Sequence, residues 1–509
     1  MLPSGCASPE CAKTWDGKST LKMDQRTVTF KLLPGLKWSD GTALTAADSL
    51  YSFNVASDTA TPVSKRIVDR TAAYQATDEQ TISWTGVPGY APQRFDGLFW
   101  SPLPKHMLSK YKPADLLKAE EAAVKPLGWG PYKLEEWKKG AFIRLSKNAN
   151  YFRAAEGLPK FDTLVFRFLG EQGDNNLQAL LSGECDVVDE SVLLFDQLQI
   201  LLQQEAARKL RVYIGQGPEW EQLSFGIKPA SYDDGYNPAS DRADFFGDLK
   251  MRQAVAYCID RDALNRTLLN SRSGVPAGLV PPSHPLYMPE LAALPYDVAK
   301  GNQLLSELGW KDTDNNPATP RVADTAARVT KGTPLSLTYL TTEATLRRKT
   351  AEMIAKNLAD CGIQVKVQMQ NPGVLYAAGP DGALFGRKFD LAQFSWEAGS
   401  QPPCNLYETS TIPTAKNSWL GGNITGYSNA AYDAACQQAR AARPEPAADY
   451  VKRNQEAQKL FAQALPVLPL YYRLKLAASR PDLCGFEMDV TARSVLWNLE
   501  QLSYGGVCP

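Results

Sequence analysis

The side chains that most often do chemistry in enzymes are scarce in this sequence. It contains only two histidines, His106 and His284, and they lie in different segments. A histidine-based metal site or a serine–histidine–aspartate triad therefore has very few ways to form. There is also no Gly-x-Ser-x-Gly, no Gly-x-Gly-x-x-Gly and no Walker loop. We therefore expect no catalytic residue, no bound metal and no cofactor.

Cysteine is the other reactive side chain, with nine copies. None forms a Cys-x-x-Cys, and their spacing does not suit zinc held by thiolates alone. Disulfides formed in an oxidising compartment are the better explanation. Loop closure and position favour the pairs Cys6–Cys11, Cys404–Cys436 and Cys484–Cys508, with Cys258–Cys361 as a possible fourth pair and Cys185 left over.

Side chains suited to binding gather in residues 388–404. Residues 389–396 predict a strand with Ala392, Phe394 and Trp396 on one face, because side chains alternate along a strand. A Gly-Ser-Gln-Pro-Pro break follows, where strand pairing must stop. Aromatic side chains at the very end of a strand are well placed to line a cleft, so we expect this strand to contact a bound solute.

Length and composition limit the classes of protein that the chain can represent. Its 509 residues are too many for one core and predict two or three domains. With 44% hydrophobic and 22% charged residues it has the composition of an ordinary globular protein. Lys plus Arg equals Asp plus Glu at 55 each, so no net charge attracts nucleic acid or an anionic membrane. The apolar runs are too short to span a bilayer.

The local patterns predict mixed α/β structure around the strand at 389–396. Residues 27–32 predict a strand, and Thr45 to Asp48 form a capping box that begins a helix. Further along, strand, helix and strand follow one another in residues 334–340, 343–361 and 363–367. This βαβ unit implies a parallel pair with a right-handed crossover, to which the strand at 389–396 adds. A last helix is predicted at 450–465.

The stretch at residues 29–48, TFKLLPGLKWSDGTALTAAD, strongly resembles the signature of the peptide/nickel/opine class of ABC-importer solute-binding proteins. Further resemblances to that class follow in the same order along nearly the whole chain. They are LPKH at 103–106, GWGPYKLEEW at 128–137, NANY at 148–151, LLSGECDVV at 180–188, MRQAVAYCIDR at 251–261 and ALPVLPLY at 464–471.

This resemblance implies an α/β, two-lobe periplasmic-binding-protein-like fold of type II, class C, with an extra domain and a hinge between the lobes. Lobe I would contain residues 1–20, 126–248 and 480–509. The extra domain would contain residues 21–125, and lobe II residues 249–479.

The resemblance also implies that this sequence is truncated at its N-terminus. Residues 1–6 have neither the charged nor the apolar region of a signal peptide. Family members carry a lipoprotein signal and the first strand of lobe I before this point. We therefore expect the full-length protein to be a lipoprotein at the periplasmic or extracellular face of the cell membrane, with its only membrane attachment on the missing segment.

The function implied is that of an extracytoplasmic solute-binding protein, which closes its lobes on a peptide or related solute and delivers it to the permease subunits of an ABC importer. We expect a monomer that performs no catalysis and binds no nucleic acid. The predicted ligand-binding residues are Trp220, Phe394, Ser395, Trp396, Glu397, Gly399, Ser400 and Tyr407.

Gly399 departs from the pattern of this class. Peptide-binding relatives often carry an aspartate at this position, three residues after the tryptophan, and it holds the α-ammonium group of the peptide. Its replacement by glycine also makes an uncharged or capped peptide, or an oligosaccharide, a suitable ligand. A secreted hydrolase and the ligand-binding module of a sensor are the alternatives from other classes.

Overall fold

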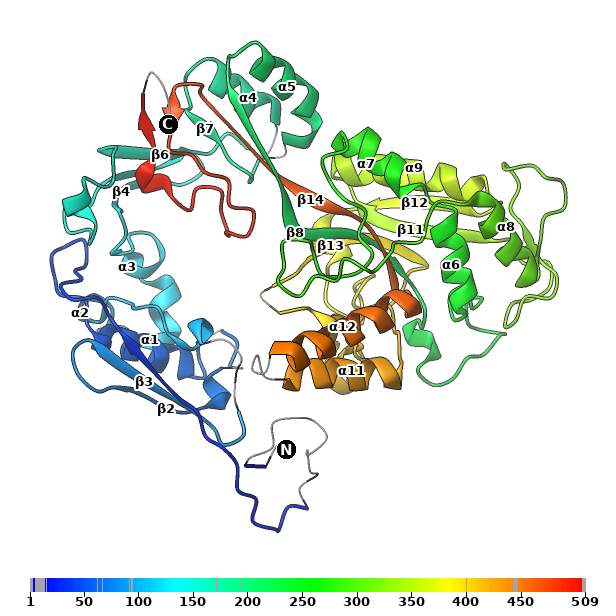
Figure 1. Ribbon diagram of the computed structural model, residues 1–509, viewed down its shortest axis with the longest axis horizontal. Helices are drawn as coiled ribbons and strands as arrows, with labels where there is room; N and C mark the ends of the chain where they lie inside the picture. Colours follow the sequence, from blue (N-terminus) through cyan, green and yellow to red (C-terminus); the bar gives the residue numbers. More distant parts are fainter. Residues whose placement is uncertain are drawn as a thin grey trace.

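The computed structural model describes residues 3–4, 14, 16–61, 63–65, 67–90, 92, 95–170, 173–192, 194–399, 401–442 and 447–505. Figure 1 shows two bodies joined by a pair of long strands, β8 and β14. Helices α6 to α9, α11 and α12 surround one end of this pair, and α4 and α5 lie at the other end. No helix in the described part of the chain is both long and apolar enough to cross a membrane.

The largest sheet has six strands in the order β12-β11-β13-β8-β14-β7. Strands β8 (Arg211–Phe225) and β14 (Val467–Ser479) pair antiparallel along most of their length. The short β7 (Val187–Val188) adds to β14 at one end of the pair. At the other end, β8 pairs with β13 (Leu391–Glu397). Both long strands thus pass between lobe I and lobe II. The residue ranges given above for the two lobes and the extra domain stay a prediction.

The predicted βαβ unit is confirmed, with bounds that differ by up to three residues. Strands β11 (Ser336–Thr342) and β12 (Gln364–Gln370) are parallel, and α9 (Thr345–Ala359) connects them. Gly362 follows α9 with φ +72°, a left-handed conformation that favours glycine. Strand β13 joins this sheet, as the sequence predicts, and lies parallel to β11 on its other side.

The helices of lobe II cover the two faces of this sheet separately. Helix α9 packs on one face with α6 (Leu249–Tyr257), α7 (Arg261–Leu269) and α8 (Val298–Glu307). Helices α11 (Ala430–Ala441) and α12 (Ala447–Ala464) pack together on the opposite face, where they enclose Trp220. Helix α12 begins three residues before the predicted position.

The first described part of the chain forms a small sheet with a helix. Strands β1 (Thr27–Lys31), β3 (Thr81–Gly86) and β2 (Thr71–Ala76) are antiparallel in that order, and α1 (Ala46–Ser57) packs on them. The predicted capping box between Thr45 and Asp48 is present. The short helices α2 and α3 follow, at Lys105–Leu108 and Glu120–Ala123.

The elements of lobe I comprise a three-stranded antiparallel sheet, β4-β5-β6, and two helices. Their bounds are Tyr132–Lys138, Phe142–Lys147 and Thr163–Arg167 for the strands, and Gly173–Leu181 and Leu198–Ala206 for α4 and α5. The remaining short elements are β9 (Trp310–Lys311), β10 (Val322–Ala323), α10 (Pro372–Leu375), β15 (Leu483–Cys484) and β16 (Ser503–Tyr504).

Two of the four suggested disulfides are confirmed. Cys258 bonds to Cys361, joining the end of α6 to the end of α9, and Cys404 bonds to Cys436 in α11. Cys185 is a free cysteine, as expected. The other two pairs include Cys6, Cys11 and Cys508, which lie outside the described residues.

Arg252 in the MRQAVAYCIDR segment has a structural role. It is 5% exposed and donates hydrogen bonds from Nε to the carbonyl oxygen of Leu465 (3.1 Å) and from Nη2 to that of Ala464 (2.9 Å). Its Nη1 donates to the carbonyl oxygen of Phe246 at 2.6 Å. Burial lowers the pKa of Arg252 to about 10. The guanidinium therefore satisfies the last carbonyl groups of α12 just before β14 begins.

We predict that Arg252→Leu lowers the free energy of unfolding by about 3 kcal/mol, because several buried carbonyl oxygens lose their donor. Arg252→Lys should lose nearly as much, since an ammonium group cannot reproduce the planar set of donors. Urea denaturation followed by circular dichroism measures both. Arg348→Leu, at an exposed position on α9, is the control, and an equal loss there would contradict the prediction.

Candidate functional site

Strand β13 extends beyond its neighbour on one side. Its register with β11 ends at Ala392, whereas its register with β8 continues to Glu397. The amide of Ala398 continues the pairing on the β8 side by donating to the carbonyl oxygen of Pro218 at 3.2 Å. No strand in the described part of the chain pairs with the other edge of residues 394–397, which we call the open edge.

The open edge lies where the parallel strands of lobe II end. Strands β11, β12 and β13 are parallel, so their carboxyl ends share one side of the sheet, and α9 and α10 begin there. Ligands of open α/β sheets bind at this side. Strands β8 and β14 leave the sheet from the same side towards lobe I (Figure 1). The open edge therefore lies on the side of the sheet from which the two long strands extend towards lobe I.

The aromatic residues predicted on β13 share one face, as expected. Phe394 is 4% exposed and Trp396 is partly exposed, with ring centroids 5.8 Å apart. Tyr376, just after α10, places its ring 6.4 Å from that of Phe394 and is 38% exposed. The Nε1 donor of Trp396 is buried and has no hydrogen-bond partner in the structure.

The polar residues predicted on β13 occupy the other face and the turn that follows. Ser395 is partly buried, whereas Glu397 is exposed and lies directly opposite Glu219 in β8. Gly399 is exposed, and a Cβ atom added there would meet no atom within 4 Å. Ser400 lies outside the described residues.

Trp220 and Tyr407 lie on the same face of the sheet as Trp396, in the core beneath α11 and α12. They are 0% and 1% exposed, and each donates a hydrogen bond of 2.9 Å to Oε1 of Gln222. Burial raises the pKa of Tyr407, which keeps its hydroxyl protonated as a donor. In this conformation neither side chain offers surface to a solute, so their predicted ligand contact stays a prediction.

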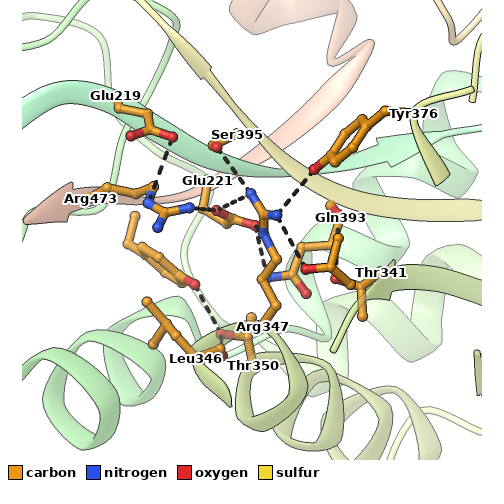
Figure 2. A network of polar contacts seen from close by, with 12 residues as sticks. Glu219, Glu221, Thr341, Leu346, Arg347, Thr350, Tyr376, Gln393, Ser395 and Arg473 are labelled. Atoms are coloured by element: carbon orange, nitrogen blue, oxygen red, sulfur yellow. Dashed lines mark hydrogen bonds and ion pairs between the residues drawn. The ribbon is translucent and has the colours of Figure 1, made fainter. Parts of the chain in front are cut away.

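On the other face of the sheet, which carries Ser395, a buried carboxylate on β8 connects several elements (Figure 2). Glu221 has no exposed surface. Its Oε1 accepts from Nε of Arg347 at 2.7 Å and from Nε2 of Gln393 at 3.1 Å. Its Oε2 accepts from Nη1 of Arg473 at 3.3 Å. One carboxylate thus joins α9, β13 and β14 to β8.

Arg347 extends this network to the open edge. From the first turn of α9 it donates to the hydroxyl groups of Ser395 (3.0 Å), Tyr376 (3.1 Å) and Thr342 (3.3 Å). Burial by itself lowers the pKa of Arg347, but the attraction of the Glu221 carboxylate outweighs it, and the pKa is raised. Burial also raises the pKa of Tyr376. Both groups therefore keep their protons, and the Tyr376 hydroxyl accepts from the Arg347 guanidinium.

Arg473 reaches the network because β14 is irregular at this point. Its register with β8 shifts between Pro469 and Tyr471 and again between Tyr472 and Leu474. Such bulges re-aim side chains and increase local twist. Arg473 thereby contacts Glu221 and also places Nε 3.7 Å from Oε1 of Glu219.

The sequence patterns missed this polar network. Glu221, Arg347, Tyr376 and Arg473 come from four segments that only the folded chain brings together. One available signal was the alternation of Glu221 with Leu223 and Phe225, which puts an acidic side chain on a buried strand face. A buried charge requires a partner, so that position predicts a cation from elsewhere in the chain.

The two histidines lie in separate places. His106 is 2.9 Å from Oδ2 of Asp40, and Nδ1 of His284 accepts a 3.0 Å hydrogen bond from the amide of Leu286. Among the described residues no group of three or more His, Cys, Asp and Glu side chains could hold a metal ion. The groups gathered at the open edge are backbone, aromatic and hydrogen-bonding groups, which suit non-covalent recognition.

Known proteins resemble the chain along most of its length. The profile of the bacterial extracellular solute-binding proteins, family 5 Middle, matches residues 7–418. The oligopeptide-binding protein AppA of Bacillus subtilis (strain 168) is 24% identical over 491 residues, covering 92% of this chain and 79% of that protein.

Solved structures share the fold. The oligopeptide-binding protein from Thermus thermophilus, complexed with a pentapeptide, aligns with a TM-score of 0.70 at 21% identity, over 98% of this chain and 86% of that chain. NikA from Brucella suis, in complex with Fe(III)-EDTA, aligns with a TM-score of 0.74 at 17% identity, over 94% and 89% respectively. These likenesses confirm the expected α/β periplasmic-binding-protein-like fold.

We predict that Glu221→Gln lowers the free energy of unfolding by about 3–5 kcal/mol, because two guanidinium groups stay buried without their carboxylate. The double variant Glu221→Gln/Arg347→Met should recover part of that loss, since it removes one of the stranded charges. Chemical denaturation measures both variants. The exposed pair of Glu136 and Arg144 provides the control, and Glu136→Gln should cost less than about 1 kcal/mol.

Proposed function

The chain belongs to family 5 of the bacterial extracellular solute-binding proteins, and we propose that it captures peptides for an ABC importer. The peptide would bind between the lobes, along the open edge of β13. The likeness to AppA, which is called an oligopeptide-binding protein, supports this ligand class. The family consists of binding proteins, and in our proposal this chain likewise performs no chemistry on its cargo.

The open edge is the observation that carries the proposal. A strand edge with free amide and carbonyl groups accepts an extended peptide as an additional strand. Here no strand of the described chain pairs with this side of residues 394–397, so the edge offers a short stretch of main chain at the carboxyl end of the sheet. Main-chain pairing fixes the direction of a peptide and does not depend on its side chains.

Predicted ligand-binding residues surround this edge. In our proposal Trp396 and Tyr376 present aromatic surface to the peptide, Phe394 packs against both rings, and Nε1 of Trp396 is a donor that has no hydrogen-bond partner in the structure. Glu397 and Gly399 lie at the end of β13 and just beyond it, and the predicted contact of Ser400 lies outside the described residues. Trp220 and Tyr407 pack beside Trp396 on the same face of the sheet, and both donate to Gln222.

Delivery requires a change of shape, which we assign to the two long strands. Strands β8 and β14 would act as the hinge, and contacts made only when the lobes have closed on a peptide would stabilise the closed state. The permease would recognise the composite surface of the closed lobes. A monomeric state, a lipid anchor and a place on the outer side of the cytoplasmic membrane belong to the same proposal.

A thermal-shift screen with di- to hexapeptides tests this function. We expect some peptides to raise the melting temperature without being cleaved, because a ligand that binds only the folded state stabilises it. A peptide N-methylated at alternate amides should bind at least about tenfold more weakly, since it loses main-chain hydrogen bonds. Cleavage of the peptides, or stabilisation by oligosaccharides alone, would overturn the proposal.

We predict that Trp396→Ala weakens peptide binding by about tenfold, because it removes aromatic surface beside the open edge. Trp396→Phe should retain most of the affinity. Trp137→Ala, on the exposed part of β4, is the matched control and should bind as the wild type does. Isothermal titration calorimetry gives the three dissociation constants, and equal values for Trp396→Ala and the control would exclude this contact.

We predict that Gly399→Asp increases the preference for peptides with a free α-ammonium group. The position is open and its backbone is not in the left-handed region, so the new carboxylate fits without a clash. A charge-assisted hydrogen bond should give about a tenfold gain for free over N-acetylated peptides. Gly399→Asn is the neutral control, and a gain of the same size there would show that charge is not the cause.

A further inference from the structure

The two lobes touch each other on one face of the β8–β14 pair. On this face a single hydrophobic core runs from lobe I to lobe II, and it includes Leu194 and Leu198 on one side and Leu337 and Ile354 on the other. The 3-10 helix η6 (Leu194–Gln197) and α5 of lobe I approach α7 and α9 of lobe II. In Figure 1 this contact lies above the strand pair.

On the opposite face the two lobes have separate cores. Lobe I and the C-terminal segment pack around Phe486 and Val495, whereas lobe II packs around Tyr407 and Phe461, and the two cores share no residue. The exposed parts of Trp396 and Tyr376 at the open edge belong to this face. The lobes can therefore approach each other on the face that carries the proposed peptide site.

Two polar contacts connect the lobes on the continuous face. Nζ of Lys349 in α9 lies 3.7 Å from Oδ1 of Asp196 in η6, with side chains 47% and 39% exposed. Nε2 of Gln199 in α5 donates to Oδ1 of Asn270, the residue that ends α7, at 2.5 Å. Both contacts sit at the surface, where they can open without burying a charge.

A cavity lies between the helices at the rim of this contact. It has a volume of about 120 Å³ and is lined by residues of both lobes, among them Phe195, Leu198, Thr267 and Leu346. Side chains do not fill this space. Separation of the helices at this cavity loses few dispersion contacts because no side chain fills it, and the polar pairs lie at its rim.

We propose that the contact of η6 and α5 with α7 and α9 is a latch that holds the ligand-free protein open. Rotation about β8 and β14 that closes one face must separate the elements on the other. The Asp196–Lys349 and Gln199–Asn270 contacts therefore belong to the open state and break as the lobes close on a solute. This inference rests on the proposed function, because it assumes that closure accompanies binding.

The latch sets ligand affinity without contacting the ligand. The apparent dissociation constant equals the intrinsic one divided by the fraction of molecules that are competent to close. A weaker latch raises that fraction, so peptide binding becomes tighter by the same factor. An exposed ion pair has a small energy, and reversal of one charge converts its attraction to repulsion.

The test is a charge-reversal cycle on this ion pair. Lys349→Asp and Asp196→Lys should each tighten the binding of a peptide from the screen by about threefold, because each makes the pair repulsive. The swapped variant Asp196→Lys/Lys349→Asp should return to the wild-type value. Arg348→Asp makes the same charge change one residue away, on an exposed position paired with Glu352, and is the control. Small-angle X-ray scattering without ligand should show more compact molecules for the two single variants.

Each outcome decides the inference. Tighter binding in both single variants with recovery in the swap supports the latch, whereas affinities equal to that of Arg348→Asp overturn it. Weaker binding in both would place the contact in the closed state and also overturn it. If the wild type binds no peptide, the proposed function fails, and the scattering of the ligand-free variants still decides the latch by the presence or absence of compaction.

Discussion

The antiparallel pairing of β8 with β14 is the constraint on which the rest of the structure depends. The strands comprise 15 and 13 residues, and their hydrogen bonds extend from the helices of lobe I to those of lobe II. Strand β13 attaches to β8, and β7 attaches to β14. The position of the open edge therefore follows from where β8 leaves the sheet. A shift of one residue in this pairing would move the side chains of one strand to the opposite face of the pair.

Glu221 adds a second constraint, because its buried charge must be paired with arginine side chains from other elements. A buried carboxylate with two arginine partners need not stabilise a protein more than apolar residues of the same size. Its effect here is geometric, because Arg347 can satisfy Glu221 only if the first turn of α9 faces β8 while Ser395 lies beside it. The network thus holds the backbone of the open edge in one arrangement relative to the hinge strands. Rigid support of this kind favours precise recognition.

Much of the fold follows from local patterns in the sequence, whereas the site depends on long-range pairing. The βαβ unit, the capping box at Thr45 and the aromatic face of β13 all arise from alternation or spacing within one segment. The open edge instead depends on where β11 ends relative to β13, and Arg347 lies 126 residues from its partner Glu221. The alternation that placed Phe394 and Trp396 on one face of β13 did not predict that α11 and α12 would cover Trp220. A single strand shows its two faces but not which of them other elements will bury.

The two register shifts in β14 concern the motion of the lobes, and they lie in a different strand from the side chains that would contact the cargo. They lie between Pro469 and Leu474, where the long strands pass between the lobes. An interrupted ladder twists and bends more easily than a regular one. The axis of motion would then be set by main-chain geometry, whereas the surface that meets the cargo is set by side chains on β13 and the turn after it. Substitutions could change what such a protein carries and leave how it moves unaltered, so that one hinge serves for the evolution of many specificities.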